Sequence, residues 1–567
     1  MKLSKYILMT SALLLGAAAA AYADDFDSFG DFGSFGDEAS GPASGLEVNG
    51  SAELDIRAYV DTSDKDNKDD ADKIDLQAIP DAKLDLKYSG NKSDVELKLK
   101  VDEDTIKNHP IDVIDEAVLR GYFGNLILEA GKMKLVWGKG DKLHVLDNFN
   151  ADDYSDFIIP DYLDRRISTP MLRAVYSLPF ANMNLEGVYT PLLPVDRFAA
   201  DGRWTPAQVT KLTGSVRSNA EVQLASVIEN LENARLEAAT ASALETLGSA
   251  EASAKLTLLV SQAYAEGKIS PDPDLIQTLM GAGKTLPEAT ALALAAAYKD
   301  YLKTNLSNAE TAYTLSLANA NNLSASPDVI YPDLWNLKYG QFGARATWTL
   351  GQVDMGLSYY NGWYKQPSVN ASKMNSFLSS YLEDGQVAED EKFLAYDKKQ
   401  TFGIEASSVI WHFNVRGEFA YNLTNDIAGT DPWVHNNSIA WLGGFDIDLP
   451  FWNANLNVQE IGSYIFHGDE CDKNTMDVDY GVKGYTNNKV VCNITTSFMN
   501  DKLAPEVTVM YGIERGDLVV MPKLAFKPDQ NLTLTASGMY IWCCDDDSEF
   551  KDWERNSFVS ISASYTF

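Results

Sequence analysis

The stretch from Val136 to Pro170 carries the densest group of side chains in the sequence that could do chemistry. Carboxylate and amide oxygens are the ligands that calcium prefers. Five such side chains occur close together here, namely Asp147, Asn148, Asn150, Asp152 and Asp153. The spacing lacks the glycine and the distal glutamate of a known calcium loop. We therefore expect no metal, and instead a loop in which Arg165 and Arg166 pair with these carboxylates against a wall of the protein.

Catalytic motifs are missing from the sequence. There is no GxSxG nucleophile elbow, no HExxH helix and no phosphate-binding loop. The five histidines are scattered, at His109, His144, His412, His435 and His467. None has a serine at a spacing that would suggest a nucleophile and its base. We expect neither an enzyme nor a cofactor.

A two-residue alternation of apolar and polar side chains runs from Leu46 to the C-terminus and defines the elements that must position these groups. In the last segment Val559, Ile561 and Phe567 share one face, and serines occupy the other. About eighteen such segments can be counted, with sixteen as the alternative. Short turns and long polar connections alternate between them, as in an outer-membrane barrel.

These features predict an all-β fold, a transmembrane antiparallel β-barrel. A soluble sandwich or propeller is the competing interpretation, but nothing in the sequence would cover so many apolar faces, whereas lipid covers all of them. Aromatic residues near strand ends would form the interfacial girdles. They are Trp348, Tyr359, Tyr360, Trp363, Trp411, Trp441 and Trp542.

The polar faces of the predicted strands carry charges of both signs. The expected pore-lining residues are Glu53, Asp55, Arg57, Lys83, Asp85, Lys87, Glu96, Lys98, Lys100, Arg345, Arg416 and Glu418. Opposite charges on adjacent strands should form transverse pairs around a water-filled path with weak ion selectivity. No lumen-facing apolar stripe stands out, which makes a transporter of hydrophobic substrates the weaker interpretation.

The N-terminus has the features of an exported protein. Residues 1–23 combine Lys2 and Lys5 with an apolar run and a small-residue cleavage site, which predicts a signal peptide cut after Ala23. Residues 24–45 repeat Phe, Gly, Asp and Ser and predict a flexible, acidic periplasmic tail. The barrel would then occupy residues 46–567. The net charge of -34 makes nucleic acid an improbable partner, because it would be repelled.

One long segment, residues 203–327, departs from the strand pattern. Apolar residues recur there at helical spacing, and capping boxes begin at Ser218, Thr285 and Ser307. We expect a helical insertion in the connection after the seventh strand, on the side of the long loops. It is either an external cap or a plug folded into the lumen, and we favour the cap.

Four cysteines occur, at Cys471, Cys492, Cys543 and Cys544. They form no CxxC motif and have no neighbouring histidine, so zinc is not expected. In an oxidising compartment they could staple a loop. The sequence leaves both the pairing and the alternative of free thiols open.

Part of the chain, Leu46 to Ala200, resembles an uncharacterised family of porin-like Gram-negative outer-membrane barrels, known as a domain of unknown function. The family pattern has a strand ending in Trp-Gly, followed by an Asp-x-x-Asn-x-x-Asp loop. The matching positions are Gly131, Lys132, Trp137, Gly138, Asp147, Asn150, Asp153, Pro191 and Arg197. The resemblance implies residence in the cell outer membrane. In such barrels the terminal phenylalanine is read by the barrel assembly machinery, which implies this role for Phe567.

Two functions follow from this reading. The first is a porin-like channel for diffusion of small polar or amphipathic solutes. A constriction loop would then include Trp137, Asp147, Asn150, Asp153, Arg165 and Arg166. The second is an adhesin or other surface interaction protein that uses the helical insertion, with the barrel as its anchor in outer-membrane lipid. The sequence leaves the solute open, and also whether the protein is a monomer or a trimer.

Overall fold

The computed structural model of the chain describes residues 45–60, 74–200, 202–325, 327–468, 486–544 and 548–567. The expected signal peptide and nearly all of the expected periplasmic tail lie outside the described residues, as does Cys471. The described cysteines, Cys492, Cys543 and Cys544, are free thiols. The chain divides into two compact units. The first comprises residues up to 207, 333–368 and 396–567, and the second comprises 208–332 and 369–395.

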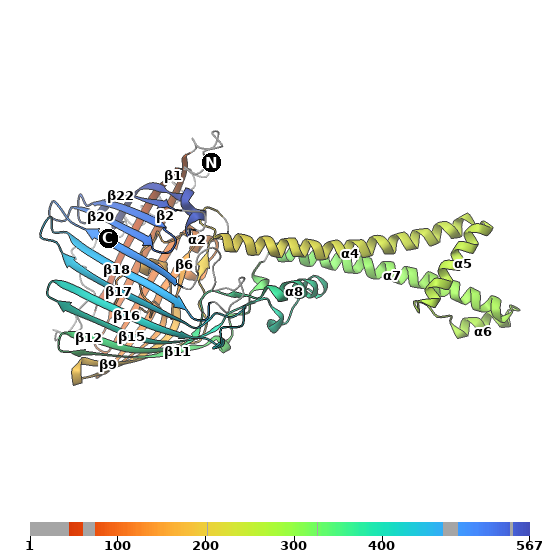
Figure 1. The fold of residues 1–567 in the computed structure, drawn as a ribbon, viewed down its shortest axis with the longest axis horizontal. Coiled ribbons are helices and arrows are strands. Elements are labelled where there is room, and N and C mark those ends of the chain that lie inside the picture. The colour runs from red at the N-terminus through yellow and green to blue at the C-terminus, as the bar shows by residue number, and fades with distance from the viewer. Residues whose placement is uncertain (1–44, 61–73, 201, 326, 469–485, 545–547) are drawn as a thin grey trace. The chain divides into compact units, whose positions relative to one another are not determined.

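The first unit is a closed antiparallel β-barrel of eighteen strands (Figure 1). Its strands are β1 (Gly45–Val60), β2 (Ile74–Ser89), β3 (Ser93–Asp102), β4 (Ile114–Phe123), β5 (Leu126–Met133), β8 (Thr169–Leu178), β9 (Met183–Thr190), β11 (Gln341–Leu350), β12 (Val353–Trp363), β15 (Lys398–Ile410), β16 (Phe413–Leu423), β17 (Ser438–Asp448), β18 (Asn455–Ile465), β19 (Thr486–Thr495), β20 (Leu503–Gly512), β21 (Leu518–Phe526), β22 (Leu532–Trp542) and β23 (Phe558–Thr566). Each strand pairs with the next, and β23 pairs back with β1, so the sheet has no free edge. The expected fold class is confirmed with eighteen strands, and sixteen is excluded.

The two faces of the wall differ as the alternation predicts. On β23, Val559 and Ile561 are 60% and 69% exposed on the outside, whereas Ser560 and Ser562 are buried on the inside. Large apolar side chains are exposed in the same way on strands around the ring. An apolar outer face and a polar inner face are what a membrane barrel requires. In the described part of the chain, no helix combines the length and apolar character needed to span a bilayer.

The two rims of the barrel are built differently. On one rim the strands are joined by turns of two to seven residues, and every longer connection lies on the other rim. The C-terminus lies at the short-turn rim, where Phe567 and Gly50 exchange two backbone hydrogen bonds of 2.9 Å. One residue expected in the aromatic girdles lies elsewhere, because Tyr360 faces the lumen and is buried. Its neighbour Tyr359 occupies the opposite face of β12.

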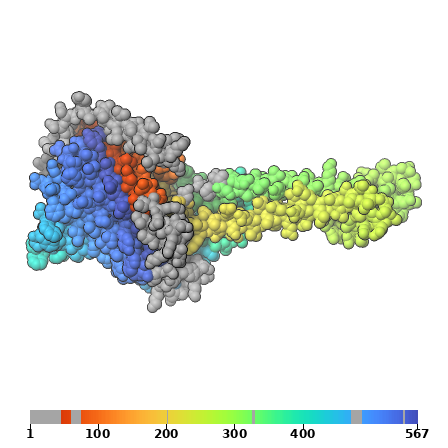
Figure 2. All heavy atoms as spheres, turned by 90° about the horizontal axis from the view of Figure 1, so that it is seen from above, coloured from red at the N-terminus to blue at the C-terminus, as the bar shows by residue number. Residues whose placement is uncertain are grey.

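The second unit is helical. Its elements are α4 (Ala207–Leu247), α5 (Ala250–Ala265), α6 (Pro273–Gly281), α7 (Leu286–Ala325) and α8 (Ala371–Asp384). The long helices α4 and α7 lie side by side (Figures 1 and 2), joined by the ion pairs Arg235–Glu310 and Lys299–Glu245. Asn319 and Asn322 of α7 donate hydrogen bonds to α8. Helices α4 to α7 follow β9, the seventh strand of the barrel, and α8 lies in the connection between β12 and β15.

The remaining elements are short. They are α2 (Glu103–Lys107), β6 (Ala151–Tyr154), α3 (Tyr162–Arg165), β7 (Arg166–Ile167), β10 (Arg197–Phe198), β13 (Ser368–Val369), β14 (Leu394–Ala395) and six 3₁₀ turns. Strands β6, β7 and β10 form a small sheet. Its backbone hydrogen bonds join the two ends of residues 151–167, within the connection between β5 and β8, and add β10 from the connection after β9.

Candidate functional site

The connection between β5 and β8, residues 134–168, folds into the barrel, and we call it the lumen loop. Its large apolar side chains pack on lumen-facing positions where the wall has no side chain. A Cβ atom added to Gly343 would lie 2.8 Å from both Trp137 and Phe149, and one added to Gly403 would lie 2.5 Å from Leu146. The glycines of β11 and β15 therefore make room for the loop.

These contacts form an apolar core inside the lumen. The ring of Phe149 lies edge-on to Trp137 and to Tyr360, at centroid distances of 5.0 and 5.2 Å. The buried members of this core are Val118, Met133, Leu135, Trp137, Leu146, Phe149, Met171, Val188, Tyr360 and Ala420. Burial of this many apolar side chains fixes the loop against one half of the wall.

Glu418 of β16 holds the loop backbone. Its Oε1 accepts hydrogen bonds from the backbone N–H groups of Lys139 and Gly140, both at 2.7 Å, and its Oε2 accepts one from Val145 at 2.9 Å. His144 Nδ1 lies 3.0 Å from the same carboxylate. The Glu418 side chain is fully buried by these contacts. A buried carboxylate that receives several N–H groups is strongly held, because no water competes for it.

The loop is braced internally by its own polar residues. Asn150 accepts a hydrogen bond from Leu135 N–H at 2.7 Å and donates to the Ile167 carbonyl at 2.9 Å. Arg166 pairs with Asp147 and donates to the Asn150 carbonyl. Asp147 and Asn150 do not border the open cavity, whereas Arg166 does. They act as scaffold, in which Asp147 Oδ2 accepts hydrogen bonds from both Arg166 and Tyr162.

The far side of the loop reaches the opposite wall. Asp156 pairs with Arg57 of β1 at 2.7 Å, and Asp164 pairs with Lys83 of β2 at 2.8 Å. Counted along the paired strands, β1 lies eight strands from β16, where Glu418 holds the near side. The lumen loop therefore crosses the lumen.

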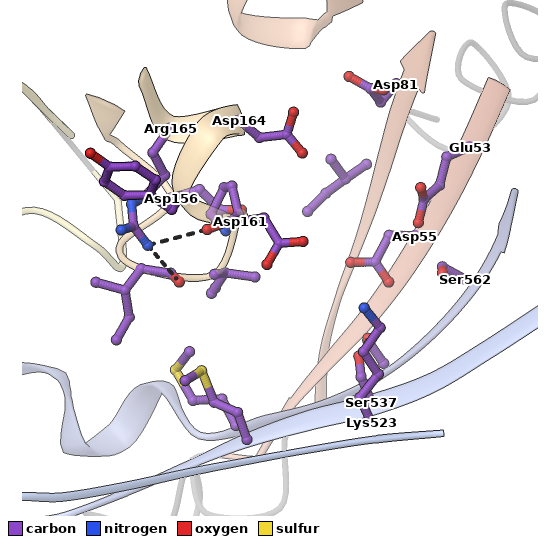
Figure 3. Close-up of a pocket in the computed structure, with 18 of the residues that line it drawn as sticks. Glu53, Asp55, Asp81, Asp156, Asp161, Asp164, Arg165, Lys523, Ser537 and Ser562 are labelled. Atoms are coloured by element: carbon purple, nitrogen blue, oxygen red, sulfur yellow. Dashed lines mark hydrogen bonds between the residues drawn. The ribbon is translucent and has the colours of Figure 1, made fainter. Parts of the chain in front are cut away.

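Arg165 differs from the expectation that it pairs with carboxylates. Its Nη1 donates to the carbonyl oxygens of Ile158 and Pro160, both at 3.2 Å. Asp153 is likewise engaged locally, since its Oδ1 accepts from Ser155 N–H at 2.9 Å. Arg165 thus fixes the shape of the loop segment that faces the open part of the lumen, as Figure 3 shows.

The open part of the lumen is a cavity of about 1750 Å³, bounded by the lumen loop and by β1–β3 and β18–β23. Eight of the predicted site residues line it: Glu53, Asp55, Arg57, Lys83, Lys100, Asp153, Arg165 and Arg166. The others lie elsewhere. Asp85, Lys87, Glu96 and Lys98 share the inner face of β2 and β3 but do not border the cavity, and Arg345, Arg416, Glu418, Trp137, Asp147 and Asn150 lie at the wall that the loop covers or within the loop.

A row of alternating charges crosses the wall outside the cavity. Its members, in strand order, are Arg120, Glu129, Arg173, Glu186, Arg345 and Glu405. Arg173 Nε lies 2.6 Å from Glu186, and Arg345 Nη1 lies 3.8 Å from the same carboxylate. These are transverse pairs of the expected kind, but only Arg345 was among the predicted residues. The missed signal is opposite charge at matched inward positions of successive strands.

The cavity wall is divided into a polar part and an apolar part, which the strand patterns did not predict. Toward the short-turn rim its wall carries hydroxyl and amide groups, on Thr508, Thr533, Thr535, Ser537, Ser560, Ser562, Ser564, Asn457 and Asn493. Toward the long-loop rim it carries Met510, Met521, Met539 and Phe558. The expectation that no apolar stripe faces the lumen is therefore wrong. The strand patterns hid it, because methionines at inward positions look like breaks in the alternation.

One carboxyl group of the lumen loop has an altered acidity. Burial, and the nearby Asp196 carboxylate, raise the pKa of Asp152 to about 7. Arg166 Nε lies 3.7 Å from Asp152, too far for a hydrogen bond, and does not offset these effects. Across the described ranges, no three or more His, Cys, Asp or Glu side chains are grouped so as to hold a metal ion.

These features define a class of protein: an eighteen-stranded barrel with an inward-folded loop and a polar cavity beside it. The chain belongs to the family described as "Protein of unknown function (DUF1302)", whose profile matches residues 35–440. No curated protein sequence is significantly similar to it.

Three of the solved structures similar to this chain each cover 92% of it. OccAB3 of Acinetobacter baumannii has a TM-score of 0.39 at 8% identity, with 99% of that chain covered. A BenF-like porin from Pseudomonas fluorescens Pf-5 has a TM-score of 0.40 at 9% identity, with 98% covered. OpdO of Pseudomonas aeruginosa has a TM-score of 0.38 at 8% identity, with 96% covered.

Proposed function

We propose that this protein is a porin-like channel of the cell outer membrane through which small polar or amphipathic solutes diffuse. One observation carries the proposal: the lumen loop covers one half of the inner wall and leaves a cavity of about 1750 Å³ along the other half. A barrel of this strand number is wider than side chains can fill. The covered half supports the loop, and the open half is the path.

The lining of the cavity suits water and polar solutes. Among the described residues, fifteen carboxylates and eleven lysines or arginines border it, with a track of hydroxyl and amide groups between them. Mixed charges hold water in the lumen without setting a large barrier to neutral solutes. The surplus of four carboxylates should give weak preference for cations over anions.

Several further assignments belong to this proposal. Outer-membrane lipid covers the apolar outer face, a cleaved signal peptide of residues 1–23 directs export, and residues 24–45 remain in the periplasm. Phe567 is the contact for the barrel assembly machinery. Its backbone bonds to Gly50 place it where the sheet closes, which is consistent with a role in completing the barrel. No catalytic step is part of the proposal.

Liposome swelling tests the channel directly. The purified full-length protein should admit sugars of increasing size until a sharp limit is reached, and a variant lacking residues 208–332 is measured beside it. Swelling with both proteins supports a channel with the helices outside the path. Swelling with the deletion variant alone shows that the helices act as a plug. If neither protein admits sugars, the channel fails, and a surface interaction role of the helical unit replaces it.

A further inference from the structure

The apolar end of the cavity is a continuous surface. Met521 of β21 pairs with Thr508 of β20, which makes Met510 its diagonal neighbour on the same face. On the next pair of strands, Met539 of β22 pairs with Phe558 of β23. The lumen loop contributes Ile158 and Ile159, and the connection before α4 contributes Trp204. We call Met510, Met521, Met539, Ile158, Ile159 and Trp204 the methionine patch. All six border the open cavity.

The loop side of the patch is held in place. Arg165 binds the carbonyl oxygens of Ile158 and Pro160. Phe157, next in the chain, stacks on Trp204 at a centroid distance of 5.1 Å and an interplanar angle of 3°. These contacts fix the two isoleucines at the cavity wall. Met539 and Trp204 are buried in an apolar cluster, and Met510, Met521, Ile158 and Ile159 pack against that cluster while remaining partly exposed, so these four form its surface toward the cavity.

Carboxylates border the same cavity nearer to the short-turn rim. Arg57 forms ion pairs with both Asp55 and Asp156, and Lys83 forms an ion pair with Asp164. Glu53 of β1 lines the cavity and has no ion-pair partner among the residues that the structure describes. Figure 3 shows Glu53 and Asp55 projecting from β1 on the side that faces the loop carboxylates.

We propose that the open cavity holds a subsite for amphipathic organic cations, which extends from the methionine patch to the carboxylates around Glu53. The apolar body of the solute would lie on the methionine patch, and its cationic group would lie among the carboxylates around Glu53. Methionine side chains are flexible and polarisable, so the patch would accept a range of shapes. Surplus carboxylates would favour a positive charge over a negative one. The inference rests on the proposed channel and names a class of solute for it.

Block of the single-channel current tests the subsite in the full-length protein. Three probes separate its two parts: benzyltrimethylammonium has ring and charge, tetramethylammonium lacks the ring, and benzenesulfonate has the opposite charge. We expect the half-blocking concentration of benzyltrimethylammonium to be about tenfold lower than that of either other probe. Equal block by the three probes overturns the subsite.

Two variants with matched controls locate it. Met521→Gln should raise the half-blocking concentration of benzyltrimethylammonium about fivefold, because an amide replaces apolar contact, while Met499→Gln in the exposed turn before β20 leaves it unchanged. Glu53→Gln should raise it about threefold, and Glu47→Gln, on the same face of β1 but outside the cavity, should not. If the channel conducts and the block is unaltered in both Met521→Gln and Glu53→Gln, the subsite is overturned. If the wild-type protein shows no conductance at all, the proposed channel itself is overturned.

Discussion

At the scale of single residues, the glycines of the wall decide whether the lumen loop can dock. Gly343 faces Trp137 and Phe149, and an added methyl group would lie 2.8 Å from both rings. Overpacking of this kind typically costs about 1–3 kcal/mol. We expect Gly343→Ala to shift the tryptophan fluorescence and the near-UV circular dichroism. Gly187→Ala, where an added Cβ meets nothing within 4 Å, is the control. Identical spectra for the two variants would contradict the packing described here.

Glu418 is the second residue on which the docked loop depends. Glu418→Ala leaves the N–H groups of Lys139, Gly140 and Val145 without their acceptor, and each buried group left unpaired costs about 1–3 kcal/mol. Amide hydrogen exchange of residues 139–145 should accelerate at least about tenfold. The matched control is Glu47→Gln, which removes an exposed carboxylate of β1. Unchanged exchange in Glu418→Ala would show that the carboxylate does not hold the loop.

Asp152 should make the loop sensitive to pH. Burial and Asp196 raise its pKa to about 7, above the value of about 3.9 expected in an unfolded chain. The protonated carboxyl group therefore favours the folded loop fully below about pH 4, and this contribution is lost as the pH rises toward 7. We expect more current fluctuations at pH 8 than at pH 5. Asp152→Asn should remove that difference, and a difference that persists in the variant would exclude Asp152 as its source.

At the scale of elements, ion pairs help to hold the far side of the lumen loop. Among the described residues, the ion pairs that join it to β1 and β2 are Arg57–Asp156 and Lys83–Asp164. Ion pairs of this kind contribute about 0.2–1 kcal/mol each. We expect the double variant Asp156→Asn, Asp164→Asn to make loop openings, seen as conductance fluctuations, up to about tenfold more frequent. Asp161→Asn, at a carboxylate that is largely exposed, should leave them unchanged. Equal fluctuation in both variants would mean that these pairs do not anchor the loop.

The elements also show what the sequence could and could not predict. The alternation of Val559, Ile561 and the serines between them sets the two faces of β23, since period two is local information. The inward position of Tyr360 and the methionine patch could not be read in this way. Whether an apolar side chain on a strand faces lipid or lumen depends on what fills the lumen opposite to it. For Tyr360 that is Phe149, 211 positions away in the chain.

The lumen loop illustrates the same limit at the candidate site. Its acidic and arginine residues were recognisable as a polar cluster, and Arg166 does pair with Asp147. The residue that holds its backbone, Glu418, looked in the sequence like any other lumen charge. A loop's partner on a distant strand follows from the strand register around the whole ring, which no short stretch of sequence contains.

At the scale of the whole molecule, the account's central claim is that a water-filled path runs through the barrel beside the docked loop. Single-channel recording of the purified full-length protein in a planar bilayer tests it most directly. We predict discrete, ohmic conductance steps with a reversal potential that shows weak cation preference, because fifteen carboxylates face eleven lysines and arginines along the described cavity. Incorporated protein that gives no steps above the lipid baseline would contradict the claim.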